Sequence, residues 1–473
     1  MKQERGGACA KCRGLSVGGW TWVVAVPVIC LGPESAGAGP LFGPRTDYAT
    51  GSGPISVAIA DLNADGWADV VVVDRNSNGV SVLLGRGDGT LVPKSDFGIS
   101  GSPMSIVVAD LNLDGHPDLV MGSEGSAVYV LRGNGDGTFG AETAGFVGQL
   151  PFSVGVADLN GDGQTDVVAA NYYDRSSAVS VLMGMGDGTL GSASNIGWGL
   201  GPIALGIADL NADGRPDLVV ANGRRDFVST YLGNGDGTFA AHTDMGVGIQ
   251  PTSLKVVDLN SDGSPDLVVA GQHQTVNVFV GNGDGTFGFK GAVAVGVNPN
   301  SIAVADLDLD GKLDLAVANE ESNSVSVATG NGDGTFQVAT DLGSGDVPSA
   351  VALGDLNGDG KPDLVVANFG SNTVSVRLNT TPATSVRASL SIAPVSNPVK
   401  GGLKLAITLP SAERADVEVF DVAGRMAGRR TVASASGREE IALPEAAGWK
   451  PGVYLVRVRQ GGRIATSRAC VVL

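Results

Sequence analysis

A nine-residue motif recurs seven times along this chain, and its regular spacing restricts the possible folds more than any other feature. The copies read DLNADGWAD, DLNLDGHPD, DLNGDGQTD, DLNADGRPD, DLNSDGSPD, DLDLDGKLD and DLNGDGKPD, and they begin at residues 61, 110, 158, 209, 258, 306 and 355. Neighbouring copies therefore start 48–51 residues apart. A constant period of this length indicates one supersecondary unit repeated along the chain.

Each repeat has the pattern of four β-strands. The strand entering the motif alternates large aliphatic residues, such as Val57 and Ile59, with mostly small ones, such as Ala58 and Ala60. After the motif come a nearly continuous apolar run (DLVVAN), a third strand (VSVLL), a GDGT turn and a fourth stretch. This order of strands and turns predicts an all-β protein whose repeats are the blades of a seven-bladed β-propeller. An open β-solenoid is the alternative, but it needs shorter units.

The ends of the repeat region predict how the ring closes. The seventh repeat stops after its third strand, VSVRLNTT, without a GDGTF sequel. Residues 40–50, PLFGPRTDYAT, resemble a fourth strand without a blade of its own. We therefore expect the N-terminal strand to complete the last blade, so that no sheet edge is left exposed.

The motif carries oxygen-bearing side chains at positions 1, 3, 5 and 9 and glycine at position 6 in every copy. A hard cation needs this pattern, because the oxygens converge, glycine permits a sharp turn, and position 7 has to offer only its backbone carbonyl. An acidic turn between strands is the alternative. The candidate ligands are Asp61, Asn63, Asp65, Asp69, Asp110, Asn112, Asp114, Asp118, Asp158, Asn160, Asp162, Asp166, Asp209, Asn211, Asp213, Asp217, Asp258, Asn260, Asp262, Asp266, Asp306, Asp308, Asp310, Asp314, Asp355, Asn357, Asp359 and Asp363.

Charge is the second argument for a cation. The whole chain has a formal charge of −18, and residues 39–388 contain 40 acidic against 15 basic residues. Of those 40 acids, 22 lie in the seven loops, where they would repel one another without a counter-ion. We predict up to seven structural Ca²⁺ ions, and a lower melting temperature in chelator. The acidic charge argues against nucleic acid as a partner.

The DxNxDGxxD loops and GNGDGTF turns resemble the FG-GAP or VCBS repeats of integrin α-chain propellers and many bacterial surface proteins. The resemblance covers about residues 40–380, and it implies calcium in the loops. The loop also resembles the first nine positions of an EF-hand, but it lacks the glutamate at position 12 and is flanked by strands. We predict a propeller over residues 39–380.

A candidate ligand surface lies where the repeats differ most, on the face opposite the loops. It comprises Tyr172, Tyr173, Trp198, Arg224, Arg225 and Phe227, with Asp174, Arg175 and Asp226 beside them. Rings and guanidinium groups there could stack on sugars or anchor a protein. Solvated loops with incidental aromatic residues are the alternative. The tripeptide Arg86-Gly87-Asp88 is best interpreted as a hairpin turn that carries one substitution.

The sequence offers no catalytic constellation. Its three histidines, His116, His242 and His273, are isolated, and most aspartates belong to the loops or GDGT turns. We therefore expect a non-catalytic binding or adhesion module whose partner is a protein or glycan at the cell surface. A lectin-like module, a polysaccharide-degrading enzyme and a scaffold without a ligand are the alternatives.

The N-terminal residues 1–38 read as a signal peptide. Basic residues precede the apolar run WTWVVAVPVICLG and small residues follow it, and the run is too short for a stable membrane anchor. A disordered basic tail is the alternative. The CAKC stretch at residues 9–12 has no second pair to complete a metal site. We expect no transmembrane segment in the mature chain.

After a polar linker at residues 381–389 the composition changes. Residues 390–473 hold 12 basic against 7 acidic residues, and alternating runs such as ADVEVFDV predict about seven strands in a small Ig-like β-sandwich. The segments NP (397–398), VFDVAGR (419–425) and PGVYLVRV (451–458) resemble the sorting domain of proteins exported by type IX secretion. That resemblance implies contact with the secretion machinery and a secreted or outer-surface location. A generic Ig-like adhesion module is the alternative.

Overall fold

The computed structural model describes residues 41–173, 179–197 and 201–381. In the C-terminal part it describes residues 391–394, 403–409, 414–420, 425–432, 437–443, 452–460 and 463–471. The expected signal peptide, the residue Trp198 and nearly all of the expected linker lie outside these ranges. Among the described residues, no helix is long and apolar enough to cross a membrane.

Seven antiparallel four-stranded sheets follow one another along residues 46–377, as the repeats predict. The first strands are β2 (Pro54–Ala60), β6 (Pro103–Ala109), β10 (Pro151–Ala157), β14 (Pro202–Ala208), β18 (Pro251–Val257), β22 (Pro299–Ala305) and β26 (Pro348–Gly354). The second strands are β3 (Asp69–Asp74), β7 (Asp118–Ser123), β11 (Asp166–Asn171), β15 (Asp217–Asn222), β19 (Asp266–Gly271), β23 (Asp314–Asn319) and β27 (Asp363–Asn368).

The outer two strands of each sheet follow the same order. The third strands are β4 (Gly79–Leu83), β8 (Ala127–Gly133), β12 (Val179–Leu182), β16 (Phe227–Tyr231), β20 (Thr275–Gly281), β24 (Ser324–Ala328) and β28 (Thr373–Arg377). The fourth strands are β5 (Ser95–Gly98), β9 (Phe139–Phe146), β13 (Ser194–Ile196), β17 (Thr243–Gly246), β21 (Phe287–Ala294), β25 (Thr340–Gly343) and β1 (Thr46–Ala49). One short 3₁₀ turn, η1 (Arg75–Ser77), follows β3.

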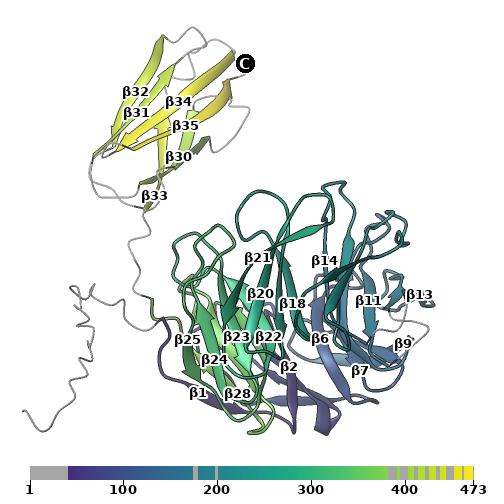
Figure 1. The fold of residues 1–473 in the computed structure, drawn as a ribbon. Helices are drawn as coiled ribbons and strands as arrows, with labels where there is room; N and C mark the ends of the chain where they lie inside the picture. Colours follow the sequence, from purple (N-terminus) through teal and green to yellow (C-terminus); the bar gives the residue numbers. More distant parts are fainter. Residues whose placement is uncertain are drawn as a thin grey trace, which may run out of the picture. The chain divides into compact units, whose positions relative to one another are not determined.

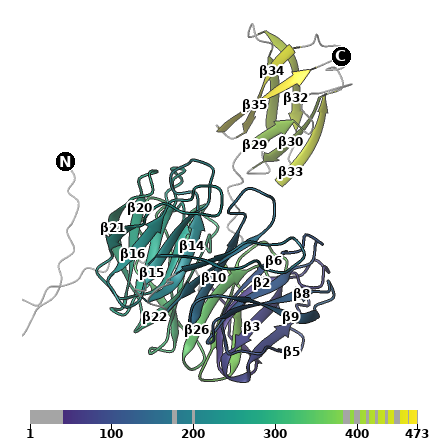
Figure 2. The same ribbon diagram turned by 90° about the vertical axis from the view of Figure 1, so that its right-hand side faces the viewer.

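The first strands of neighbouring sheets contact one another all the way round, from β2 through β26 and back to β2. The seven sheets are therefore blades arranged in a closed ring, which Figures 1 and 2 show from two directions. Each first strand begins with proline, which suits the inner edge of a blade because it donates no hydrogen bond there. Each second strand is buried along its whole length, which explains its continuous apolar sequence.

The hydrophobic core is divided among the blade interfaces. The described residues form seven clusters, each made from two adjacent blades. Small residues on the first strands allow the blades to approach closely. A Cβ atom at Gly155 would lie 2.6 Å from the side chain of Leu205, and one at Gly206 would lie 2.6 Å from Val256. The alternation of large and small residues is thus a packing requirement of the ring.

The N-terminal strand closes the ring, as the sequence predicted. Strand β1 pairs antiparallel with β28, and Thr46 lies opposite Val376. The seventh blade has no GDGT turn. Asn379 makes the hydrogen bonds that this turn and the residue before it make in other blades. The Asn379 backbone N–H donates to Asp363, and its side-chain amide donates to the carbonyl of Leu307 in the sixth blade.

The C-terminal part forms two further antiparallel sheets. One contains β29 (Ser391–Pro394), β30 (Leu403–Leu409) and β33 (Gly437–Leu443). The other contains β31 (Ala415–Phe420), β32 (Met426–Val432), β34 (Gly452–Gln460) and β35 (Arg463–Val471). Strand β29 contacts β34 and β35, so the sheets pack on each other. Strand β31 buries alternate residues, as its sequence pattern predicts.

Candidate metal-binding loops and ligand face

The seven motifs form loops that join the first and second strands of each blade. In the first copy, Asp61 accepts the backbone N–H groups of Asp65 at 3.2 Å and of Gly66 at 2.9 Å. Asn63 accepts the N–H of Asp65 and donates to its carboxylate. The side chains at positions 1, 3 and 5 therefore converge on one short backbone segment. The bonds from the N–H groups of positions 5 and 6 recur in the other six loops.

Two loop positions adopt the left-handed backbone conformation. The glycines at position 6 have φ between 78° and 90°, and a Cβ atom at any of them would meet nothing within 4 Å. Glycine is therefore favoured there by backbone strain and not by lack of space. Position 4 is also left-handed, with φ of 59° at Leu113 and 74° at Gly161. Sequence reasoning missed position 4, although glycine at two of its seven copies was an available signal.

The aspartate at position 9 is fully buried in all seven blades. Asp69 accepts the N–H of Leu62 at 2.8 Å and the N–H of Gly85 at 2.7 Å. Because Gly85 follows the third strand, this carboxylate ties the loop to the outer hairpin of its own blade. Both bonds recur in every blade, with Asn379 as the second donor in the seventh. Burial raises the pKa of Asp69, and the two backbone bonds partly oppose this shift.

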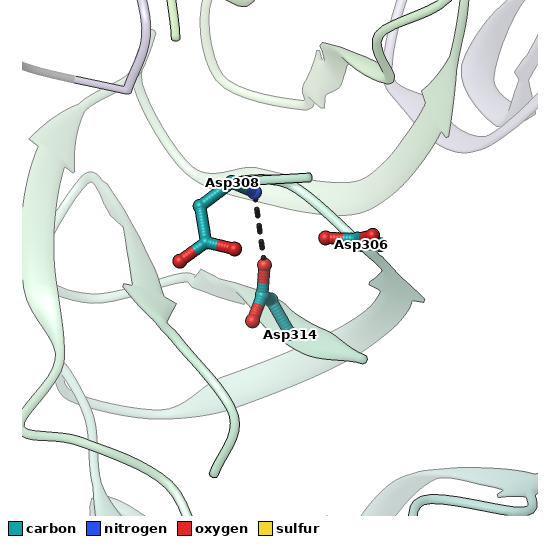
Figure 3. Close-up of side chains that lie close together, drawn as sticks. All are labelled: Asp306, Asp308 and Asp314. Carbon is teal, nitrogen blue, oxygen red and sulfur yellow. Dashed lines mark hydrogen bonds between the residues drawn. The ribbon is translucent and has the colours of Figure 1, made fainter. Parts of the chain in front are cut away.

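The sixth loop is the most acidic, because aspartate replaces asparagine at position 3. Figure 3 shows Asp306, Asp308 and Asp314, whose carboxylate oxygens lie within 4.8 Å of one another. Burial raises the pKa of Asp314 to about 6, and the charge of Asp308 adds to this shift. Burial and the neighbouring Asp310 raise the pKa of Asp308 as well. It is the one such group of three acidic side chains among the described residues.

This donor set fits a metal ion. The loop offers only oxygen atoms, which hard divalent cations prefer, and a cation would favour the charged carboxylates that burial and, to a smaller extent, mutual repulsion disfavour. The position 9 carboxylates keep acceptor capacity, since each has about four lone-pair sites and uses two for backbone N–H groups, or three at Asp314. Buried aspartates and the acidic cluster of the sixth loop can therefore bind a metal ion.

The GDGT turns lie on the same face as the loops and join neighbouring blades. Gly137 of the second blade donates its N–H to the carbonyl of Leu62 in the first loop, and Gly89 donates to Leu356 of the seventh. In the tripeptide Arg86-Gly87-Asp88, Asp88 accepts the N–H and the hydroxyl of Thr90. The other turns bond in the same way, so the tripeptide has the ordinary turn geometry of this protein.

On the opposite face, the structure brings together three of the candidate ligand residues. The Arg224 guanidinium lies 4.6 Å from the ring centroid of Tyr172 and 4.8 Å from that of Tyr173. The two tyrosine rings meet edge to face at 5.0 Å, and Phe152 of strand β10 lies 6.0 Å from Tyr172. We call Phe152, Tyr172, Tyr173 and Arg224 the aromatic cluster. It connects the third and fourth blades.

The remaining candidates stand apart from the aromatic cluster. Arg225 is exposed, and Phe227 is half-buried at the start of strand β16, where it pairs with Gly246. Trp198, together with Asp174 and Arg175, lies outside the described residues. Phe152 was missed in sequence reasoning because it occupies a position on the first strand where other blades carry isoleucine, methionine or polar residues.

Comparison with protein families identifies the repeats. Residues 61–121, 110–169, 158–220, 209–269, 258–317 and 306–366 match the FG-GAP-like repeat family, and together these matches include all seven loops. The chain therefore belongs to the FG-GAP-like repeat proteins. Residues 395–472 match the secretion system C-terminal sorting domain. This domain directs the protein through the type IX system to the cell surface or the medium, and it implies an interaction with the secretion machinery.

A solved structure shows the same architecture. BBS1N, crystallised in complex with ARL6DN, is 15% identical, with a TM-score of 0.53 over 72% of this chain and 97% of that one. A lectin of Agrocybe aegerita that recognises non-reducing terminal N-acetylglucosamine is 25% identical, with a TM-score of 0.46 over 67% of this chain and 86% of that one. No curated protein matches the chain. Repeat propellers of this family are typically non-catalytic.

Proposed function

We propose that this protein is an exported, calcium-stabilised β-propeller that binds a ligand noncovalently at the cell surface or outside the cell. The observation that carries the proposal is the aromatic cluster on the face opposite the loops. Its guanidinium and rings are in contact, and the Tyr173 side chain remains 56% exposed. Exposed tyrosine and arginine are the side chains that most often dominate binding surfaces.

Calcium is the ion we assign to the loops. Positions 1, 3, 5 and 9 would hold it through their side chains and position 7 through its carbonyl; in the first loop these residues are Asp61, Asn63, Asp65, Asp69 and Trp67. All are oxygen ligands, and calcium tolerates the irregular geometry of a mixed carboxylate and amide set better than magnesium does. An extracellular setting supplies millimolar calcium, which suits sites with dissociation constants of about 10⁻⁴–10⁻³ M.

The binding role is tested with the full-length protein on an array of glycans, surface polymers and cell-surface proteins in millimolar calcium. We expect a ligand whose binding is lost on Tyr173→Ala. Phe146→Ala is the matched control, because Phe146 is 79% exposed and lies at the end of β9, outside the aromatic cluster. Equal loss in both variants, or no ligand at all, would contradict the proposal. Shortening of a polymer on incubation would instead favour the polysaccharide-degrading alternative.

A further inference from the structure

The Arg224 side chain is contacted along both its guanidinium group and its aliphatic stem. Its guanidinium contacts the faces of Tyr172 and Tyr173, and its aliphatic stem lies on Gly201. A Cβ atom at Gly201 would come within 2.6 Å of the Arg224 Cγ, and the φ of +72° there also favours glycine. The Gly223 N–H donates to the Gly201 carbonyl at 2.8 Å, which ties the Arg224 turn to the link between blades three and four. The guanidinium is thus preorganised.

This guanidinium has no acidic partner in the part of the chain that the structure describes. Seven arginines lie beside a carboxylate, whereas Arg224 and the neighbouring Arg225 have neither an ion pair nor a side-chain hydrogen bond among the described residues; the seven are Arg45, Arg75, Arg215, Arg414, Arg429, Arg457 and Arg459. The lack of a partner is notable because acidic residues outnumber basic ones by 49 to 31 in the whole chain. The two rings lie beside the central carbon of the guanidinium and form no hydrogen bond with its N–H groups, which leaves these groups available for a planar acceptor.

We propose that Arg224 recognises the carboxylate of an acidic polysaccharide, and that the ligand class is therefore a uronic-acid polymer. This inference rests on the proposed binding role of the aromatic cluster. A carboxylate matches the guanidinium fork in geometry and charge. The exposed ring of Tyr173, beside the fork, offers a flat apolar surface for the C–H face of the same sugar. Non-specific attraction does not account for such binding, because the formal charge of −18 stays negative even with seven bound Ca²⁺, so the net charge of the protein does not attract polyanions.

The test compares hyaluronate, a glucuronate-containing polymer that millimolar calcium does not gel, with the same polymer after its carboxylates have been reduced to alcohols. Calorimetry with the full-length protein in millimolar calcium should detect binding of the acidic polymer only. Arg224→Ala should weaken binding about 10-fold to 100-fold, and Arg224→Lys should restore only part of it, because lysine keeps the charge but lacks the fork. Lys290→Ala is the control, since it removes one positive charge from the exposed part of β21, outside the candidate ligand surface, and should change affinity less than 2-fold.

Two further measurements separate this inference from the proposed function. Gly201→Ala leaves the charge unchanged but displaces Arg224, so it should weaken binding to the acidic polymer, with thermal melting confirming that the variant is folded. Equal binding of the reduced polymer, equal losses in the Arg224 and Lys290 variants, or Arg224-dependent binding of poly-glutamate alone would overturn the uronate assignment. Tyr173-dependent binding of only a neutral glycan would also overturn it while leaving the binding role intact. No binding to any polymer or protein would contradict both.

Discussion

At the residue scale, a serine on the third strand links three strands of a blade in five of the seven repeats. In four blades an asparagine at the end of the second strand donates to the serine, and the serine hydroxyl donates to a residue on the fourth strand. The bonds from Asn319 to Ser326 and from Ser326 to Asp341 are 2.9 and 2.5 Å long. The others start from Asn171, Asn222 and Asn368.

In the first blade an aspartate, Asp74, replaces this asparagine. The Ser81 hydroxyl then lies between two carboxylates, 2.6 Å from Asp74 and 2.9 Å from Asp96. One hydroxyl proton cannot serve both acceptors, and the second oxygen of Asp74 is buried without a partner. Burial raises the pKa of Asp74 from 3.8 to about 6. A protonated Asp74 can donate to Ser81 and so restore the bonding of the other blades.

The Asp74→Asn substitution should therefore stabilise the protein at high pH. Because the folded pKa of Asp74 exceeds its unfolded value, stabilisation by the bound proton is complete below about pH 4 and is lost as pH rises through about 6. Asparagine supplies the donor at every pH, so we expect a gain of about 1–2 kcal/mol at pH 8 and little change at pH 4.5. Urea unfolding of the variant and the wild type at pH 8 and at pH 4.5 measures the change in the free energy of unfolding. The same gain at both pH values would refute the explanation.

Lys255 gives a second prediction at this scale. It is the one charged residue on the seven first strands, it is exposed, and it makes no ion pair or hydrogen bond among the described residues. Strands β14 and β22 flank its own strand, β18, so the remaining direction for an exposed side chain is the axis of the ring. Desolvation by the surrounding protein lowers the pKa of Lys255. The Lys255 side chain can be exposed along the ring axis and still have a lowered pKa, because a narrow channel hydrates a charged amine poorly.

The Lys255→Met substitution should raise the melting temperature at neutral pH. The folded state disfavours the charged amine, so the penalty is present in full below the lowered pKa and disappears as pH rises above the unfolded value. Methionine retains the length of the side chain without the charge. Lys290→Met, on the exposed part of β21, is the control and should change the melting temperature little. A lower melting temperature for Lys255→Met would show that the amine has a stabilising partner, such as a bound anion.

At the element scale, repetition made the strands and loops predictable from the sequence. A single loop could be an ordinary acidic turn, whereas seven copies with glycine at position 6 predict both the turn and the candidate ligand positions. The hydrogen bonds of position 9 could not be foreseen, because they involve a hairpin about 16 residues further on. The left-handed conformation of position 4 could not be predicted, because several copies carry residues such as Leu113 there. These residues do not signal a left-handed backbone, although they adopt it at a cost of about 1 kcal/mol.

The sixth loop provides a test of the calcium assignment. Asp308→Asn converts it to the pattern of the other six loops and removes one of three neighbouring carboxylates. In chelator this relieves repulsion, so the variant should be more stable than the wild type. In calcium it removes a charged ligand, so the affinity of this loop should fall about 10-fold. The melting temperatures of the variant and the wild type, measured in chelator and in calcium, test both the expected gain in stability and the expected loss of calcium affinity. A variant that is equally stabilised in both conditions would argue for an acidic turn without an ion.

At the scale of the whole molecule, the sequence predicted the number of blades and the closing strand because both follow from counting repeats. It did not predict which ligand candidates meet. Tyr173 and Arg224 are 51 residues apart, and their contact depends on how the blade turns fold over the link at Gly201. Under the proposed function, the class of ligand would therefore depend on loops that vary between repeats, whereas the ring depends on what the repeats share.

Calcium should act on the ring as a whole, because each loop stabilises its own blade and also contacts the next one. With dissociation constants near 10⁻⁴ M, 1 mM calcium stabilises the folded state by about 1.4 kcal/mol per site, or about 10 kcal/mol if seven sites fill. We expect the unfolding midpoint to fall steeply when calcium is chelated and to recover when calcium is added in excess. Magnesium at the same concentration should restore much less, since its octahedral geometry suits these loops poorly. If the unfolding midpoint does not change in chelator, calcium has no structural role, and the loops stabilise the ring through their backbone hydrogen bonds alone.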